Sequence, residues 1–90
     1  MTYEVHLHKS ALKTLKKMDG TLRRCILNKI EHLKRDPRPY DCKKLSGSDM
    51  YRVRSGNFRI LYTIEDKKLI VLIVAIRDRK EAYKTRQSVA

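Results

Sequence analysis

The sequence predicts an α+β domain in which a mostly antiparallel sheet is covered on one face by two helices. Apolar residues recur every three or four positions between residues 10 and 35, which is typical of helices. They recur at every second position in short runs after residue 50, which is typical of strands. The order of segments is β-α-α-β-β-β, so four strands and an N-terminal helical hairpin are expected. A chain of 90 residues predicts one domain over residues 1–90.

The first expected strand spans residues 2–8, because apolar and polar side chains alternate there. His6 and His8 fall on the polar side of this strand. Two histidines on one strand can bind a metal ion, but no third ligand accompanies them in the sequence. We therefore expect both histidines to face solvent.

A short helix is expected next, with Ser10 as its N-cap and Asp19-Gly20 at its end. The glycine is expected to take the left-handed conformation that often terminates helices. The apolar stripe of this helix consists of Leu12, Leu15 and Met18.

A second, longer helix is expected to begin at the N-cap Thr21. It is expected to end at Asp36-Pro37-Arg38-Pro39, because proline removes a backbone donor and disfavours helix in the preceding residue. Arg23 and Arg24 belong to its expected solvent face. Its expected apolar face consists of Leu22, Cys25, Ile26, Ile30 and Leu33.

A loop at residues 37–49 precedes three expected strands, which are joined by hairpin-length connections at Ser55-Gly56-Asn57 and Asp66-Lys67. The last strand is apolar on both faces, which indicates a central strand covered on two sides. The tail, residues 77–90, is expected to hold one helical turn near residues 81–84. The three strands are expected at residues 50–54, 58–65 and 69–76.

The charge of the chain is its most unusual property. Lysine and arginine total 22 against 10 acids, which gives a net charge of +12. Repulsion of this size opposes compaction and predicts a polyanion or an acidic protein as partner. Nucleic acid is the expected polyanion, because cationic side chains neutralise its phosphates and release counterions. A membrane surface is disfavoured, since no segment is at once long, apolar and basic on one face.

A cytoplasmic location is expected from the termini and the cysteines. The N-terminus lacks the charged and apolar regions of a signal peptide. The longest apolar run, Leu69 to Ile76, has eight residues and is far too short to span a membrane. Cys25 and Cys42 form no metal-ligand motif and are expected to be free thiols in a reducing compartment.

A set of arginines is expected to gather on the uncovered face of the sheet. If the loop between the strands at 50–54 and 58–65 has an even number of residues, Val53 shares a face with Ile60 in the core. Arg52, Arg54 and Arg59 then share the opposite face. The segment from Met50 to Thr63 contains no acid that would neutralise them. Such a face suits an anion, because guanidinium groups bind phosphate bidentately.

Further cations and an aromatic ring follow the last strand, at Arg77, Arg79, Lys80 and Tyr83. The ring of Tyr83 offers a surface on which a base can stack. RNA carries its own nucleophile, the 2′-OH, so cationic donors alone can promote its cleavage by stabilising charge at the phosphate. Arginine stays protonated and is a poor general base. Both RNA binding alone and cleavage completed by an external scaffold are consistent with these residues.

The chain resembles the RelE toxins of the RelE/ParE toxin–antitoxin superfamily over about residues 3–84. The hairpin segment is shared by the whole superfamily, whereas Arg77 followed six residues later by Tyr83 is typical of the RNA-cleaving branch. The resemblance rests on Ser10-Ala11-Leu12-Lys13, Lys44-Leu45-Ser46-Gly47, the hairpin from Tyr51 to Tyr62, and the segment from Ile76 to Tyr83.

The resemblance implies a ribosome-dependent endoribonuclease that cuts mRNA in the decoding site by metal-free attack of the 2′-OH. Arg52 and Arg54, both on the strand expected at residues 50–54, would contact phosphate and activate the 2′-OH. Arg59 would stabilise the transition state, Arg77 would stabilise or protonate the leaving group, and Tyr83 would stack on or orient a base. The residues at the positions of Arg52 and Arg54 are often lysine in the family, so the identity of the general base stays open.

The resemblance also implies the partners of the chain. These are the ribosome with its mRNA and a RelB-like antitoxin, an acidic and mostly helical chain that blocks the basic face. No cofactor, metal or membrane partner is implied. Alternative interpretations are a ParE-like inhibitor of DNA gyrase, a non-catalytic RNA- or ribosome-binding module, and a degenerate toxin that survives only as a partner in a complex.

Overall fold

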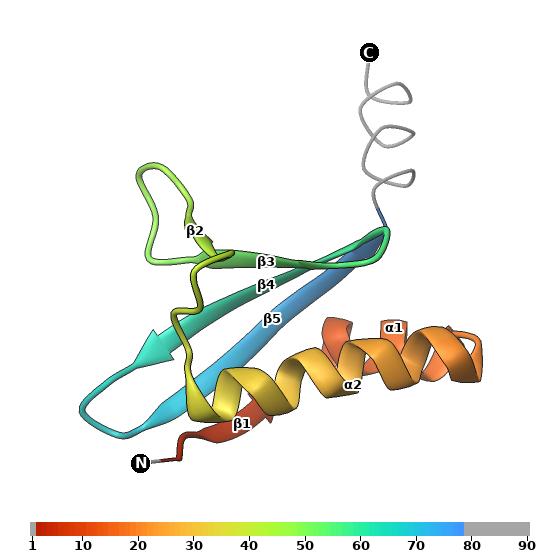
Figure 1. Ribbon diagram of the computed structural model, residues 1–90, viewed down its shortest axis with the longest axis horizontal. Helices are drawn as coiled ribbons and strands as arrows, with labels where there is room; N and C mark the ends of the chain where they lie inside the picture. The colour runs from red at the N-terminus through yellow and green to blue at the C-terminus, as the bar shows by residue number, and fades with distance from the viewer. Residues whose placement is uncertain (1, 79–90) are drawn as a thin grey trace.

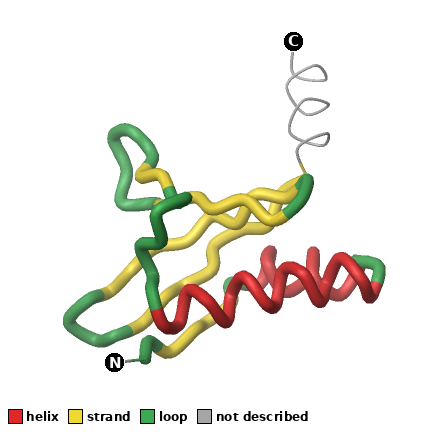
Figure 2. The backbone as a smooth tube through the Cα atoms, in the orientation of Figure 1, coloured by secondary structure: helices red, strands yellow, loops and turns green. Residues whose placement is uncertain are grey.

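The computed structural model describes residues 2–78. Two helices pack on one face of a single five-stranded sheet, whose strand order is β1-β5-β4-β3-β2 (Figures 1 and 2). The predicted α+β class is confirmed, and the short strand β2 is an addition to the four strands expected. The elements are β1 (Glu4–Leu7), α1 (Lys9–Lys17), α2 (Gly20–Arg35), β2 (Lys43–Lys44), β3 (Tyr51–Ser55), β4 (Phe58–Glu65) and β5 (Ile70–Asp78).

The sheet combines three antiparallel pairings with one parallel pairing. The antiparallel pairs are β2–β3, β3–β4 and β4–β5. The N-terminal strand β1 pairs in parallel with β5, with Glu4 opposite Ile70. The mostly antiparallel sheet is therefore confirmed. None of the helices within residues 2–78 is long and apolar enough to cross a membrane.

The hydrophobic core lies between the helices and one face of the sheet. Leu12 and Leu22, expected in the core, are 41% and 42% exposed, and Cys25 is also exposed. Leu22 borders an open hollow and Cys25 lies at the flank of the buried stripe of α2. The core cluster consists of Ala11, Leu15, Met18, Ile26, Ile30 and Leu33 from the helical hairpin, and Val53, Ile60, Tyr62, Val71, Ile73 and Ile76 from the sheet.

The helix ends differ from the sequence prediction. His8, and not Ser10, is the N-cap of α1, and its Nδ1 accepts a hydrogen bond from the backbone N–H of Ser10. The Ser10 hydroxyl donates instead to the carbonyl of Val74 on β5, at 3.0 Å. Thr21 is not the N-cap of α2, because Gly20 is already its first residue and is helical rather than left-handed. The predicted break between the two helices is confirmed, but Gly20 does not terminate α1, because it is the first residue of α2.

Arg23, in the first turn of α2, caps the C-terminal end of α1 with its side chain. Its guanidinium donates hydrogen bonds to the carbonyls of Leu15, Lys16 and Met18, at 2.8, 3.2 and 2.9 Å. The last carbonyls of a helix have no partner within the helix, and a cation near them also interacts favourably with the helix dipole. Arg23, which the sequence placed on the solvent face, therefore ties the start of α2 to the end of α1.

The Arg23→Ala substitution is expected to lower the free energy of unfolding by about 1–2 kcal/mol, because three carbonyls lose a charged donor. Urea denaturation, monitored by circular dichroism, measures the change in the free energy of unfolding. Arg24→Ala is the matched control and is expected to change stability by less than about 0.5 kcal/mol, since this neighbour is exposed. Equal effects of the two substitutions would contradict the capping role.

The connections of the last three strands explain where the strands begin and end. Gly56 and Asn57 form a two-residue turn between β3 and β4, and Gly56 has φ +61°. The β4–β5 turn is longer than expected, because Leu69 has φ +55° and belongs to the turn. Strand β5 therefore starts one residue later than predicted. The predicted central position is confirmed, because β5 lies between β1 and β4, but the predicted cover on two sides is wrong, because only one face of β5 is fully covered. The helical turn expected near residues 81–84 lies outside the described residues.

Candidate nucleic-acid interface

The register of the β3–β4 hairpin sets the face of each arginine. Val53 lies opposite Ile60, and both are fully buried under the helices. Arg54 lies opposite Arg59, one position nearer the hairpin turn on each strand. Because successive side chains of a strand point to opposite faces, these arginines project from the side of the sheet that the helices leave open. The expected even-numbered loop and the assignment of faces are confirmed.

A β-bulge brings Arg77 to the same face. Strand β5 has one extra residue, Val74, at the point where its register with Leu61 and Tyr62 of β4 shifts. Arg77 consequently lies opposite Arg59. Without the extra residue Ile76 would take that position, because a one-residue shift exchanges the two faces of a strand. The Val74 carbonyl is the acceptor of the α1 hydroxyl described above, so the helix layer helps to hold the bulge.

The structure thus gathers the four predicted arginines of the described chain, and we call this surface the arginine face: Arg52, Arg54, Arg59 and Arg77. Arg54, Arg59 and Arg77 form a row across three adjacent strands, and Arg52 lies two residues from that row on β3. Directly opposite residues on neighbouring strands are about 5 Å apart at their Cβ atoms. Three arginine side chains therefore start from neighbouring positions on one face.

These cations have no neutralising partner within residues 2–78. None of the four makes a hydrogen bond or an ion pair with another described side chain. Partial burial, followed by the charges of Arg54 and Arg59, lowers the pKa of Arg52. Like charges opposite each other cost up to about 1 kcal/mol per pair. A surface that maintains this repulsion is suited to an anion, whose binding would relieve it.

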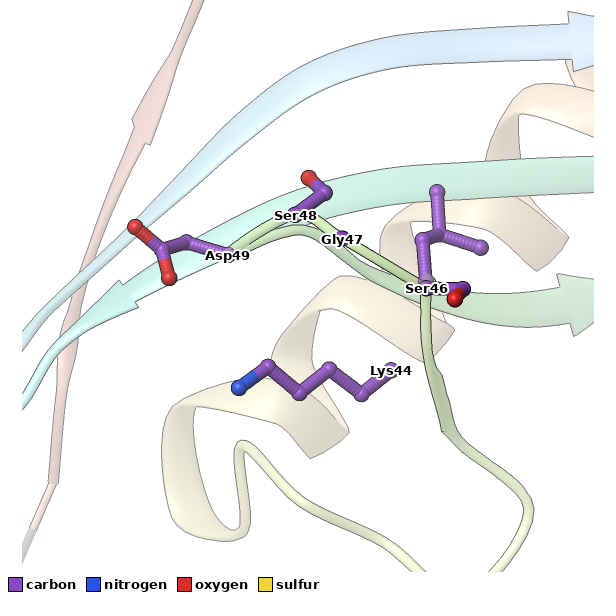
Figure 3. A pocket seen from close by; sticks show the side chains of 6 residues that line it. Lys44, Ser46, Gly47, Ser48 and Asp49 are labelled. Carbon is purple, nitrogen blue, oxygen red and sulfur yellow. The ribbon is translucent and has the colours of Figure 1, made fainter.

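Among residues 2–78 the arginine face borders no large hollow that the structure describes. One hollow of about 490 Å³ lies in the β2–β3 loop and is lined by Lys44 to Asp49 (Figure 3). A small depression of about 40 Å³ borders Arg54 and Arg59 beside the hairpin turn. A flat cationic surface fits an extended polymer better than an enclosed small molecule.

Other residues predicted to take part are placed as follows. Tyr83, with Arg79 and Lys80, lies outside the described residues, so its proposed role stays a prediction. His6 is exposed and lies 3.3 Å from Glu4, whereas His8 caps α1. No three histidine, cysteine or carboxylate side chains within residues 2–78 form a metal-binding group. Cys25 and Cys42 are free thiols, as expected.

Relatives resemble this chain over almost its whole length. The sequence profile described as the ParE toxin of the type II toxin–antitoxin system parDE matches residues 5–83. A RelE toxin from Methanocaldococcus jannaschii is 40% identical over 88 residues, which cover 93% of this chain and 98% of the relative. The chain belongs to the RelE/ParE family of type II toxins. The mRNA interferase toxin RelE of Escherichia coli is 31% identical, and the match covers 92% of each chain.

Solved RelE-type toxins share the fold of this toxin. The RelE–RelB complex from Pyrococcus horikoshii matches with a TM-score of 0.79 and 32% identity over 88% of this chain and 97% of that chain. The intact RelBE complex of E. coli matches with a TM-score of 0.74 and 28% identity over 84% and 95% of the two chains. The expected RelE-like fold is therefore confirmed.

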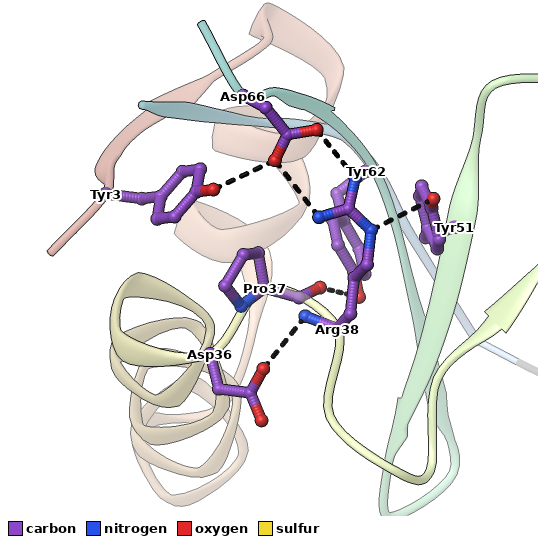
Figure 4. Close-up of polar contacts among 7 residues, drawn as sticks. All are labelled: Tyr3, Asp36, Pro37, Arg38, Tyr51, Tyr62 and Asp66. Atoms are coloured by element: carbon purple, nitrogen blue, oxygen red, sulfur yellow. Dashed lines mark hydrogen bonds and ion pairs between the residues drawn. The ribbon is translucent and has the colours of Figure 1, made fainter. Parts of the chain in front are cut away.

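A second polar cluster of the toxin lies at the opposite end of the sheet (Figure 4). Arg38 binds both carboxylate oxygens of Asp66, at 3.0 and 2.8 Å, and its Nε donates to the Tyr51 hydroxyl. The Tyr3 hydroxyl donates to the same carboxylate, at 2.9 Å. The hydrogen bonds from Arg38 and then from Tyr3 lower the pKa of Asp66 to about 2. One carboxylate thus joins the N-terminus, the loop after α2 and the β4–β5 turn.

The same loop is fixed at two further points before it reaches β2. The Tyr62 hydroxyl, which is buried, donates to the carbonyl of Pro37 at 2.7 Å. Lys29 of α2 binds Asp41 at 2.7 Å, which lowers the pKa of that carboxyl. The loop is therefore held against both layers, and β2 follows it at a defined position.

The Asp66→Asn substitution is expected to lower the melting temperature at pH 7, because the Arg38 guanidinium loses its anionic partner. A carboxyl whose pKa is lowered on folding stabilises the protein above its unfolded pKa of about 3.9 and loses this effect as pH falls towards 2. The difference between wild type and variant is therefore expected to close between about pH 4 and pH 2 in thermal melts. A difference that persists undiminished at pH 2 would contradict this account.

Sequence reasoning missed the ion pair between Arg38 and Asp66, and it missed the strand β2. Arg38 and Asp66 are 28 residues apart and neither lies in a periodic segment, so no local pattern links them. A strand of two residues is too short to show alternation. Gly47 is a turn signal in the sequence, and in the structure its φ of +70° lies in the return from β2 to β3.

Proposed function

We propose that this toxin is an endoribonuclease that cuts mRNA in the ribosomal A site without a metal ion. The observation that carries the proposal is the row of Arg54, Arg59 and Arg77 on an open face whose hairpin contains no acid. The name of the E. coli relative, an mRNA interferase, supports the reaction class. Its site of action would be the cytoplasm, where translating ribosomes hold messages.

The chemistry follows from what guanidinium groups can do to a phosphodiester. The 2′-oxygen of the substrate forms a bond to the adjacent phosphorus, and the bond to the 5′-oxygen breaks. The 2′-OH loses its proton and the leaving 5′-oxygen gains one. Arg52 and Arg54 would hold the phosphate, Arg59 would stabilise the charge of the transition state, and Arg77 would face the leaving oxygen.

The ribosome would supply what the arginine face lacks. Arginine does not act as a general base at neutral pH, because it stays protonated. A metal-free reaction then depends on holding the 2′-OH in line with the bond that breaks, and an intramolecular attack gains most from such positioning. A message fixed in the decoding site provides this geometry, whereas free RNA does not.

The proposed partner that silences the toxin is a RelB-like antitoxin. The solved relatives from P. horikoshii and E. coli are RelE–RelB complexes. The net charge of +12 favours an acidic chain, because such a partner neutralises the repulsion of the cationic surface. A thin core in a chain of 90 residues also gains stability from a partner that binds only the folded state.

Purified toxin mixed with a defined mRNA, with and without programmed ribosomes, tests the proposal. Primer extension is expected to show cuts within codons only when ribosomes are present. A message with one 2′-deoxynucleotide at the cut position is the matched substrate and is expected to resist cleavage there. Absence of cuts with a folded toxin would overturn the proposal, and inhibition of gyrase supercoiling would then favour a ParE-like activity.

A further inference from the structure

The strand β2 places two adjacent lysines on opposite faces of the sheet. Lys43 lies opposite Arg52, and Lys44 lies opposite Tyr51. Tyr51 is on the helix side, where it stacks on Tyr62 with 5.8 Å between ring centroids. Directly opposite residues of an antiparallel pair share a face, so Lys43 projects from the arginine face and Lys44 from the other side.

Lys43 is an uncompensated charge among the residues that the structure describes. It is exposed and makes no hydrogen bond or ion pair within residues 2–78. Asp41, the acid nearest to it in sequence, is bound to Lys29 at 2.7 Å. Its cross-strand neighbour Arg52 already has a pKa lowered by burial and by other guanidinium groups. Another cation opposite Arg52 adds to the repulsion and does not relieve it.

We propose that Lys43 is an RNA-binding residue that contacts a phosphate next to the one cleaved. This inference deepens the proposed function and rests on it. Lys43 and Arg52 form a second row, two residues (about 7 Å) along the sheet from the row of Arg54, Arg59 and Arg77. Together the two rows cross four neighbouring strands, or roughly 14 Å.

A surface of this length contacts more than one phosphate of a single strand, which a site for one scissile bond does not require. Lys43 lies at the β2 edge, at the end furthest from Arg77. It therefore extends the binding surface away from the proposed site of cleavage. The anchored loop after α2 fixes where β2 lies, so the ammonium group starts from a defined backbone position.

Lys43→Gln and Lys44→Gln make a matched pair for testing this inference. Each removes one charge from the same two-residue strand, and only the face differs. Binding of a fluorescein-labelled, 2′-O-methylated RNA 12-mer, which cannot be cleaved, is measured by anisotropy between 50 and 200 mM salt. Lys43→Gln is expected to reduce the slope of log affinity against log salt by about 0.7, the value for one phosphate contact with a single strand. Lys44→Gln is expected to keep the wild-type slope.

Lys43→Arg is expected to restore the wild-type slope, because it restores the charge on the same face. Equal slopes for the two glutamine variants, or no RNA binding by any of these proteins, would overturn the inference. These outcomes differ from failure of the proposed function. If the wild-type toxin never cuts ribosome-bound mRNA but the salt slopes of Lys43→Gln and Lys44→Gln differ, the phosphate contact stands and the proposed reaction is refuted. If the wild-type toxin cuts ribosome-bound mRNA but the two glutamine variants have equal salt slopes, the proposed reaction stands and the Lys43 contact is refuted.

Discussion

Substituting Arg59 by alanine is expected to lower the rate of mRNA cleavage on programmed ribosomes by about 10²–10³, the usual effect of removing one transition-state donor. Arg59 occupies the centre of the arginine row, between Arg54 on β3 and Arg77 on β5. A phosphate bound there is within reach of guanidinium groups from both sides. Single-turnover primer extension measures the loss directly, because it separates cleavage from release of the product.

The stability of the Arg59→Ala variant distinguishes a lost donor from a damaged fold. Removal of one charge from the row relieves repulsion, so the melting temperature is expected to stay the same or to rise slightly. Arg24→Ala is the matched control, since this exposed arginine of α2 lies in the helix layer. It is expected to keep wild-type cleavage. Cleavage unchanged in both Arg59→Ala and Arg77→Ala would refute the assignment of the site.

Substituting Leu33 by alanine is expected to lower the free energy of unfolding by about 2–5 kcal/mol. Leu33 is 0% exposed and lies in the core between α2 and the sheet. The lost side chain leaves a cavity that the small hydrophobic core has few other contacts to offset. Each kcal/mol corresponds to about 4–8 °C in melting temperature at this size. Urea denaturation measures the change as a shift of the midpoint at constant slope.

Leu27→Ala is the control for this prediction, because it makes the same chemical change on the same helix at a side chain that is 43% exposed. It is expected to cost less than about 1 kcal/mol. Similar losses for Leu27 and Leu33 would show that α2 does not pack as described. Binding of an antitoxin to the folded state is expected to raise the stability of both variants.

The sequence contained enough information for most of the fold and for three of the four arginines. Strand alternation and the parity of a short turn place Arg52, Arg54 and Arg59 on one face without knowledge of distant contacts. The position of Arg77 is different, because it depends on the bulge at Val74. An extra residue in an apolar run leaves no local mark, so the sequence showed only that Arg77 follows the last expected strand, and its role in the site came from the resemblance to RelE toxins.

The remaining errors come from tertiary contacts that replace local ones. Ser10 has the side chain of a good N-cap, yet its hydroxyl binds the β5 bulge and His8 takes the cap. Arg23 ends α1 through side-chain donors, so Gly20 is free to begin α2. The partners of these side chains lie in elements whose relative positions a one-dimensional pattern does not contain.

The parallel pairing of β1 with β5 joins the two ends of the described chain. Glu4 pairs with Ile70, so the sheet closes only after β5 has been synthesised. During translation β1 and the helices emerge first, and their apolar sides have no partner until the last strands follow. Contacts so far apart in sequence form late and together. The topology therefore delays activity until β5 has been made: a nascent toxin whose synthesis has not reached β5 lacks both the β1–β5 pairing and Arg77.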